Sequence, residues 1–210
     1  MKSLDKIQLK LSLKLHNYLY RRVSALVVKL NNGIHPKHNI MKYHQFFIDN
    51  ISENSNVLDI GCGIGAVTYD IAKKAKRVVG IDNNYSNIEI AKKRYNSQNI
   101  DYICEDATRF KIEENFEYIV LSNVLEHIKD RIDFLNKIKV LSKYILIRVP
   151  MINRSWLTLY KKEIGMEYRL DSSHYIEYTL ETFINEFKKA NLEILSYSVQ
   201  FGEIWAKIAT

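Results

Sequence analysis

A glycine-rich stretch that begins with an acidic residue is the first feature of the sequence that could do chemistry. Residues 57–66 read Val-Leu-Asp-Ile-Gly-Cys-Gly-Ile-Gly-Ala, which predicts a strand, a tight turn and the start of a helix. Glycines let a ligand approach the backbone, and a helix N-terminus offers free N–H groups and a positive dipole end. Gly61, Gly63 and Ala66 also fit the G-x-G-x-x-A form of a dinucleotide site, so the turn alone does not choose the ligand.

Acidic residues at three successive strand ends narrow the choice of ligand. Asp59, two residues before the first glycine, would repel a pyrophosphate but attract an ammonium and a sulfonium, which favours S-adenosylmethionine over NAD. The next apolar run ends at Asp82 and Asn83, where a carboxylate could accept both ribose hydroxyls. The third run leads into Asp106 and Ala107, where an acid and a backbone N–H could recognise the adenine amino edge. These positions together describe one adenosyl ligand across the edge of a sheet.

Alternating apolar runs and helix-period segments predict the elements that would position these acids. Strands are expected at 57–60, 77–81, 101–104, 118–121 and 144–149, and helices at 66–75, 86–96, 131–142 and 180–190. Two closing runs, 193–199 and 204–208, are joined by only a few residues and therefore predict an antiparallel hairpin. The fold class is α/β: a Rossmann-like, doubly wound, mostly parallel seven-stranded sheet with an antiparallel C-terminal hairpin and an N-terminal helical extension.

Two segments fall outside this alternation. Residues 1–45 form a basic extension or cap, helical at 19–30 and again at 38–50, although the leucines at alternate positions from 9 to 15 leave the earlier stretch undecided. Residues 46–210 form the ligand-binding domain. Within it, residues 151–178 are rich in aromatic side chains and lack a period, which is typical of a lid or substrate loop.

The motifs resemble those of a known family. Residues 57–66, 79–82, 106–107 and 122–128 look like successive motifs of class I S-adenosylmethionine-dependent methyltransferases, in a match that spans about residues 50–210. The resemblance implies transfer of a methyl group to a small molecule. It also implies which residues contact the cofactor. The methionine part would be surrounded by Asp59, Gly61, Cys62 and Gly63, and the ribose would be bound by Asp82. The adenine would be bound by Asp106 and Ala107, and Asn123 would reach the cofactor through its backbone. Asn83 and His44 complete the expected cofactor-binding set.

Two motifs of nucleic-acid base methyltransferases are absent from the sequence. The fourth strand ends Leu-Ser-Asn-Val at 121–124, without the Pro-Pro-aromatic turn that grips an exocyclic amine, and no Pro-Cys nucleophile follows it. We therefore expect no DNA partner and regard RNA as disfavoured. A ribose or tRNA methyltransferase, and a non-catalytic module that only binds S-adenosylmethionine, stay open as alternatives.

Two histidines are the candidates for catalysis. If the methyl acceptor is a hydroxyl, a base that takes its proton helps the reaction, and a positioned imidazole typically contributes roughly 10² to 10⁴ in rate. His127 follows the fourth strand, and His174 lies in the aromatic loop over the same sheet edge. The alternative for each is structural, namely orientation of the loop for His127 and an exposed loop position for His174. A metal site is not expected, because Ser122 stands where some resembling enzymes have the upstream acid of a Glu-x-x-x-Glu-His pattern.

Net charge is concentrated at one end of the chain. Of a formal charge of +7, residues 1–32 carry seven basic and one acidic side chain, which leaves the rest nearly neutral. This segment is either a solvated helix face or a contact with anionic membrane lipid. Residues 33–38 and 43–47 are also similar to methyltransferases of bacterial surface-polysaccharide pathways, which would fit a glycan or lipid-linked acceptor.

Cysteine use and hydropathy indicate the compartment. The two cysteines, Cys62 and Cys104, are isolated, and neither a secretory signal nor a run of about 18 apolar residues is found in the sequence. We expect a cytoplasmic protein, with peripheral attachment at the inner membrane surface as an alternative. The sequence does not predict the oligomeric state.

Overall fold

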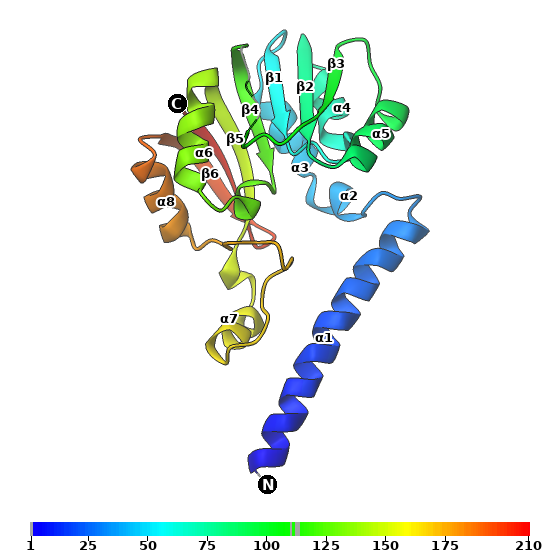
Figure 1. The fold of residues 1–210 in the computed structure, drawn as a ribbon, viewed down its shortest axis with the longest axis vertical. Helices are drawn as coiled ribbons and strands as arrows, with labels where there is room; N and C mark the ends of the chain where they lie inside the picture. The colour runs from blue at the N-terminus through cyan, green and yellow to red at the C-terminus, as the bar shows by residue number, and fades with distance from the viewer. Residues whose placement is uncertain (1, 110, 112–113) are drawn as a thin grey trace. The chain divides into compact units, whose positions relative to one another are not determined.

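A seven-stranded sheet organises the larger part of the computed structural model, which describes residues 2–109, 111 and 114–210 (Figure 1). The strand order is β3-β2-β1-β4-β5-β7-β6, and only the pairs that include β7 are antiparallel. The predicted fold class is confirmed. The strands are β1 (Asn56–Ile60), β2 (Arg77–Asp82), β3 (Ile100–Cys104), β4 (Phe116–Ser122), β5 (Ser142–Pro150), β6 (Glu193–Gln200) and β7 (Glu203–Ala209).

Helices cover both faces of this sheet. On one face, Leu58 and Ile60 of β1 share a buried cluster with Phe134 of α6 (Arg131–Ile138) and Phe183 of α8 (Leu180–Lys189). Burial of each such side chain stabilises the fold by about 1.5–3 kcal/mol. The other face is covered by α4 (Ala66–Ala72) and α5 (Tyr85–Arg94). Because β1 residues alternate between the faces, Asp59 points toward α4.

Apart from helix ends that differ by a few residues, the structure corrects the predicted helices in two places. The run expected at 38–50 is two helices, α2 (Lys37–Met41) and α3 (Tyr43–Asn50), because Lys42 between them adopts a left-handed φ of +54°. The aromatic segment contains α7 (Trp156–Glu163), which begins at Ser155, whose hydroxyl accepts a hydrogen bond from the Thr158 N–H. Trp156 is 75% exposed, so α7 lacks the buried apolar face that would reveal a helix in the sequence. Single-turn 3₁₀ helices are η1 (Leu125–His127), η2 (Lys139–Leu141) and η3 (Ile152–Arg154).

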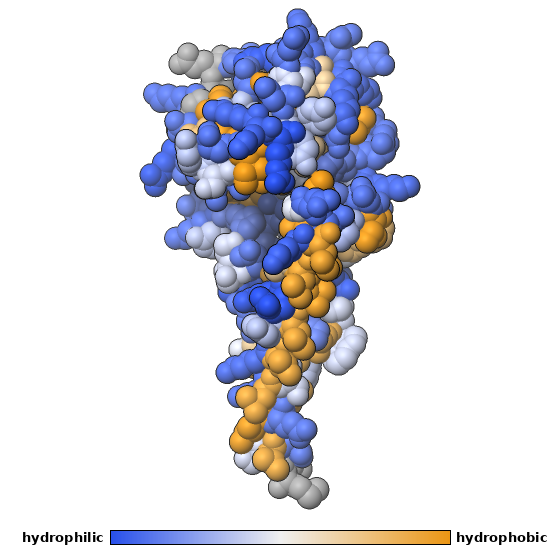
Figure 2. All heavy atoms as spheres, turned by 90° about the vertical axis from the view of Figure 1, so that its right-hand side faces the viewer, coloured by the Kyte–Doolittle hydropathy of each residue, from blue (hydrophilic) through white to orange (hydrophobic). Residues whose placement is uncertain are grey.

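The N-terminal segment is helical from its start. α1 (Lys2–Leu30) runs through the alternating leucines that periodicity left undecided. The described chain divides into two compact units, and the boundary along the sequence falls between Tyr43 and His44. Figure 2 shows apolar side chains as an orange stripe along α1. Across the described residues, no helix has both the length and the apolar character that crossing a membrane requires.

Candidate functional site

A cavity of about 930 Å³ lies at the carboxyl ends of β1, β2, β3 and β4. Ligands of open α/β sheets bind at this edge, where the strand order reverses between β1 and β4. The cavity brings together eight of the residues predicted from the sequence: Gly61, Asp82, Asn83, Asp106, Ala107, Asn123, His127 and His174. Four other predicted residues do not line it: Asp59, Cys62, Gly63 and His44.

The glycine turn is shaped by left-handed backbone conformations. Gly61 has a φ of +69°, and a Cβ there would lie 2.5 Å from the Cγ2 atom of Val124. Gly63 has a φ of +56°, but a Cβ on it would meet no atom within 4 Å. Its backbone therefore faces open space that a ligand can enter.

Asp82 is held rigidly beside this turn. One carboxylate oxygen accepts the Gly63 N–H at 2.9 Å, and the other accepts the Asn84 N–H at 2.9 Å and the Asn87 side-chain amide at 3.1 Å. Two carboxylate oxygens have about four acceptor sites, so one remains for a ligand hydroxyl. Asn84 also caps α5, which ties the end of β2 to the helix that follows it.

Asp59 and Cys62 lie beneath the turn. Asp59 is 1% exposed, and its carboxyl accepts the hydroxyl hydrogen bond of Thr68 at 2.6 Å. Burial raises the pKa of Asp59 to about 7, an effect that the charge of Asp82 adds to and the Thr68 hydrogen bond opposes. Burial likewise raises the pKa of the Cys62 thiol, so this sulfur is an inert packing group.

The acidic residue after β3 is arranged differently. Asp106 accepts hydrogen bonds from the Thr108 N–H at 2.9 Å and the Thr108 hydroxyl at 2.7 Å, and these bonds lower the pKa of its carboxyl. Its neighbour Ala107 is half-buried. An ionised carboxylate and the adjoining residue thus line the same cavity as Gly61.

Asn123 at the end of β4 is fixed by a network that the sequence prediction missed. Its φ is +59°, its amide donates to a Glu126 carboxyl oxygen at 2.8 Å, and its carbonyl accepts from Arg148. Arg148 on β5 is 2% exposed and pairs with Glu203 of β7 at 2.8 Å. The signal was present in the sequence, because an arginine interrupts the otherwise apolar run 145–149.

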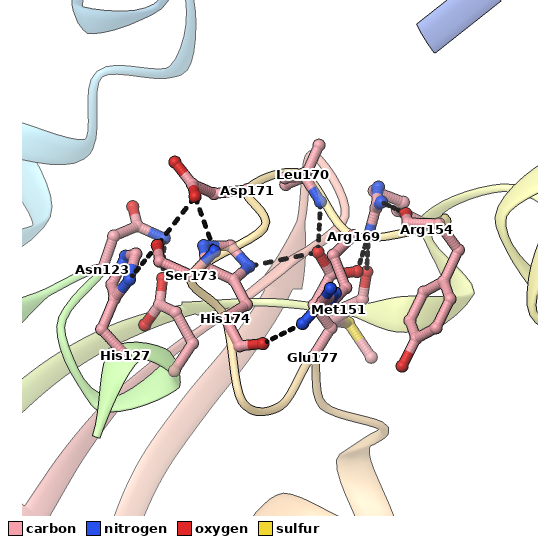
Figure 3. Close-up of polar contacts among 12 residues, drawn as sticks. Asn123, His127, Met151, Arg154, Arg169, Leu170, Asp171, Ser173, His174 and Glu177 are labelled. Atoms are coloured by element: carbon pink, nitrogen blue, oxygen red, sulfur yellow. Dashed lines mark hydrogen bonds and ion pairs between the residues drawn. The ribbon is translucent and has the colours of Figure 1, made fainter. Parts of the chain in front are cut away.

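The two candidate catalytic histidines are neighbours (Figure 3). The ring centroids of His127 and His174 are 4.6 Å apart in an edge-to-face arrangement. The Nδ1 atom of His127 lies 2.9 Å from the Ser173 hydroxyl, which lies 2.7 Å from Asp171. Burial lowers the pKa of His127, and His174 adds to this effect. His127 nevertheless remains exposed toward the cavity.

A buried acidic residue supports His174 from the other side. Glu177 lies 3.2 Å from the His174 Nδ1 atom, accepts the Leu170 N–H at 2.6 Å and pairs with Arg154. The Arg169 guanidinium donates to the His174 carbonyl at 2.9 Å. These contacts hold the segment after α7 against the cavity, so His174 is 5% exposed rather than a free loop residue.

Glu126 and His44 complete the titratable groups of interest. Glu126 is 0% exposed, burial raises its pKa to about 7, and the Asn123 hydrogen bond opposes that rise. His44 lies on α3, where its Nδ1 atom is 2.7 Å from an Asp70 oxygen on α4. The structure thus places His44 in a contact between helices, and its role toward a cofactor stays a prediction.

Comparisons with known proteins agree with this geometry. A family model described as a methyltransferase domain matches residues 34–197. The ubiquinone biosynthesis O-methyltransferase of Bradyrhizobium diazoefficiens is 32% identical over 117 residues, which is 54% of this chain and 46% of that protein. Pavine N-methyltransferase of Thalictrum flavum is 32% identical over 105 residues, 47% of this chain and 30% of that protein. The chain spans about half or less of the length of these curated relatives.

A solved structure shares the fold. N-methyltransferase NodS from Bradyrhizobium japonicum, crystallised with S-adenosyl-l-homocysteine, has a TM-score of 0.61 and 19% identity, and the match covers 81% of this chain and 86% of NodS.

Proposed function

Because the chain belongs to the class I S-adenosylmethionine-dependent methyltransferases, we propose that it transfers a methyl group to a hydroxyl oxygen of a small-molecule acceptor. One observation carries the choice of oxygen: a pair of histidines lies in the wall of the cavity that Asp82 and Gly61 also line. The family resemblance stated from the sequence is confirmed.

The cavity fits the adenosyl cofactor. Asp82 has one acceptor site left for a ribose hydroxyl, Asp106 and Ala107 can bind the adenine edge, and Gly63 leaves room for close approach. The cofactor supplies an electrophilic methyl group on a sulfonium. Asp59 lies below the turn with a pKa that burial raises to about 7, and a cation bound nearby would favour its ionised form, whereas an anionic ligand would not. Cys62 contributes backbone rather than its buried thiol.

The histidine pair would remove the acceptor proton. An imidazole titrates near neutral pH, so it can take a proton from a hydroxyl held beside it. His127 is oriented by Ser173, and His174 by Glu177, so both rings have fixed positions. The remaining task of the protein is to hold acceptor and methyl group in line and to exclude water.

The acceptor class is proposed from the relatives and the cavity together. The ubiquinone biosynthesis enzyme is named for O-transfer, whereas the pavine enzyme is named for N-transfer. A proton acceptor is of most use to a hydroxyl, which favours oxygen here. We include glycan and lipid-linked hydroxyl acceptors in the class, as the sequence suggested.

Turnover with a panel of hydroxyl and amine acceptors, followed as S-adenosylhomocysteine release, tests this function. We expect a hydroxyl compound to be methylated, and His127→Ala and His174→Ala to lower kcat roughly 10²- to 10⁴-fold with little change in cofactor affinity. Equal loss of turnover and cofactor affinity would assign the rings to structure. Cofactor binding without any turnover would favour the non-catalytic module, and salt-sensitive RNA binding would favour the RNA alternative.

We also propose that residues 1–32 contact an anionic membrane surface. The side chains of α1 that support this are apolar and exposed, at 47–69%: Leu4, Ile7, Leu11, Leu15, Tyr18, Leu19 and Leu26. Lys6, Lys10 and Lys14 recur every four residues beside that stripe, and Asp5 is the only acidic residue of α1. An apolar stripe with a basic flank is typical of a helix that lies in the lipid interface.

Sedimentation with vesicles tests the membrane contact. We expect binding to phosphatidylserine vesicles and little binding to phosphatidylcholine vesicles. At about 1 kcal/mol per lysine, changing Lys10 and Lys14 to Gln should weaken binding roughly 30-fold. Binding that is the same for both lipids, or unchanged in the double variant, would refute the contact.

A further inference from the structure

Three side chains in the cavity wall converge on one point. Glu126, His127 and His174 each offer a ligand atom, and these three atoms lie within 4.8 Å of one another. Glu126 and His127 belong to η1, and His174 lies in the segment before α8. The three ligand atoms are therefore close in space although 47 positions separate the two histidines in the sequence. Two imidazoles and a carboxylate with an open position form a known type of ligand set for divalent metals.

Hydrogen bonding leaves the unused nitrogen of each ring with a lone pair. Glu177 can only accept, so the His174 Nδ1 atom, 3.2 Å away, carries the hydrogen. The Ser173 hydroxyl donates to Asp171 and therefore accepts from the His127 Nδ1 atom. Within the described part of the chain, both rings therefore keep a bare Nε2 atom. Metal-ligating histidines are oriented by outer carboxylates in the same way.

Glu126 adds an independent observation. Its carboxyl is fully buried, and one oxygen accepts from Asn123, but among the described residues the other oxygen, Oε2, has no hydrogen-bond partner. A buried, unpaired carboxyl oxygen costs free energy, which a positive ion beside it would offset. When Glu126 is ionised, three acceptors surround one point, and such an ion or a donor from outside would stabilise them.

We propose that Glu126, His127 and His174 bind one divalent cation with mixed nitrogen and oxygen ligands, of the Zn²⁺ or Co²⁺ type. Sequence analysis rejected a metal because Ser122 replaces an upstream acid. In the structure, the third ligand comes instead from His174, 47 residues downstream of His127. The inference deepens the proposed function and rests on it for the ion's role. With the ion bound, both imidazoles are ligands rather than bases, and the ion lies beside the acceptor hydroxyl and favours loss of its proton to solvent.

Metal binding is measured directly, on tag-free full-length protein that carries Cys104→Ser. This background removes the exposed thiol as a competing ligand. We expect calorimetry to give one Zn²⁺ per chain, and Co²⁺ to give visible absorption bands of a nitrogen- and oxygen-ligated site. His174→Ala and Glu126→Gln should each weaken binding more than roughly 100-fold, and Ser173→Ala, which alters only orientation, roughly 10-fold.

A matched control and two outcomes decide the proposal. His35→Gln removes a histidine outside the cavity, hydrogen-bonded to Ser24, and should leave binding unchanged. The metal site would be overturned if the protein shows no 1:1 binding of Zn²⁺, or if the His174 and Glu126 variants bind Zn²⁺ as tightly as the protein without those substitutions. If chelator-treated protein also methylates hydroxyls at the full rate, the histidines act as bases, and the proposed function stands without the metal. If Zn²⁺ binds but neither the Zn²⁺-loaded nor the chelator-treated protein methylates hydroxyls, only the proposed function is refuted.

Discussion

Asp59 makes the stability of the cofactor-free protein depend on pH. Its carboxyl is 1% exposed, and burial raises its pKa from 3.8 to about 7. Between these values the folded state holds a proton that the unfolded state has released, so stability falls as pH rises through this window. A difference of about three pKa units corresponds to about 4 kcal/mol, at roughly 1.4 kcal/mol per unit.

Asp59→Asn removes this titration while it keeps an oxygen for the Thr68 hydroxyl. Urea unfolding at pH 4 to 8, without cofactor, should show the variant up to about 4 kcal/mol more stable than wild type at pH 8. The advantage should shrink toward zero at pH 4. Asp49→Asn, on an exposed carboxyl of α3, serves as the control and should show no such trend. A difference between Asp59→Asn and wild type that does not vary with pH would refute the reasoning.

Three further variants test the elements around the cavity. Gly61→Ala places a Cβ 2.5 Å from Val124 at a φ of +69°, so we expect a loss of about 2 kcal/mol or more in thermal unfolding, and native-like stability would contradict the tight turn. Glu203→Gln removes a charged partner of the buried Arg148 guanidinium and should cost about 3 kcal/mol in urea unfolding. Burial lowers the pKa of His127, so in His127→Ala the kcat profile should lose the fall that wild type shows as pH drops below about 6.5, and an unchanged profile would exclude this ring as the proton acceptor.

Strand patterns were the part of the fold that the sequence predicted well. Apolar runs such as 118–121 and 144–149 are buried on both faces, so their composition alone marks them as central strands. Helix ends were less predictable. The expected helix at 66–75 ends at Ala72, and the break at Lys42 depends on a backbone conformation that no proline or glycine announces.

The candidate site was predicted where short-range signals exist. Gly61, Asp82 and Asp106 follow strands directly, so their position at the sheet edge follows from topology. Other contacts around the two histidines join distant segments, as in the pair His127–Ser173 or the convergence of Glu126 with His174. Spacing along the chain carries no signal for such long-range convergence.

Calorimetry of S-adenosylmethionine binding to wild type and Asp82→Asn tests the central claim most directly. Loss of one charge-assisted hydrogen bond to a ribose hydroxyl costs about 1.5–3 kcal/mol, so the variant should bind roughly 10- to 100-fold more weakly. Asp101→Asn, on an exposed carboxylate that pairs with Arg77, should bind like wild type. Undetectable binding to wild type, or equal affinity of wild type and Asp82→Asn, would contradict the assignment of this cavity as the cofactor site.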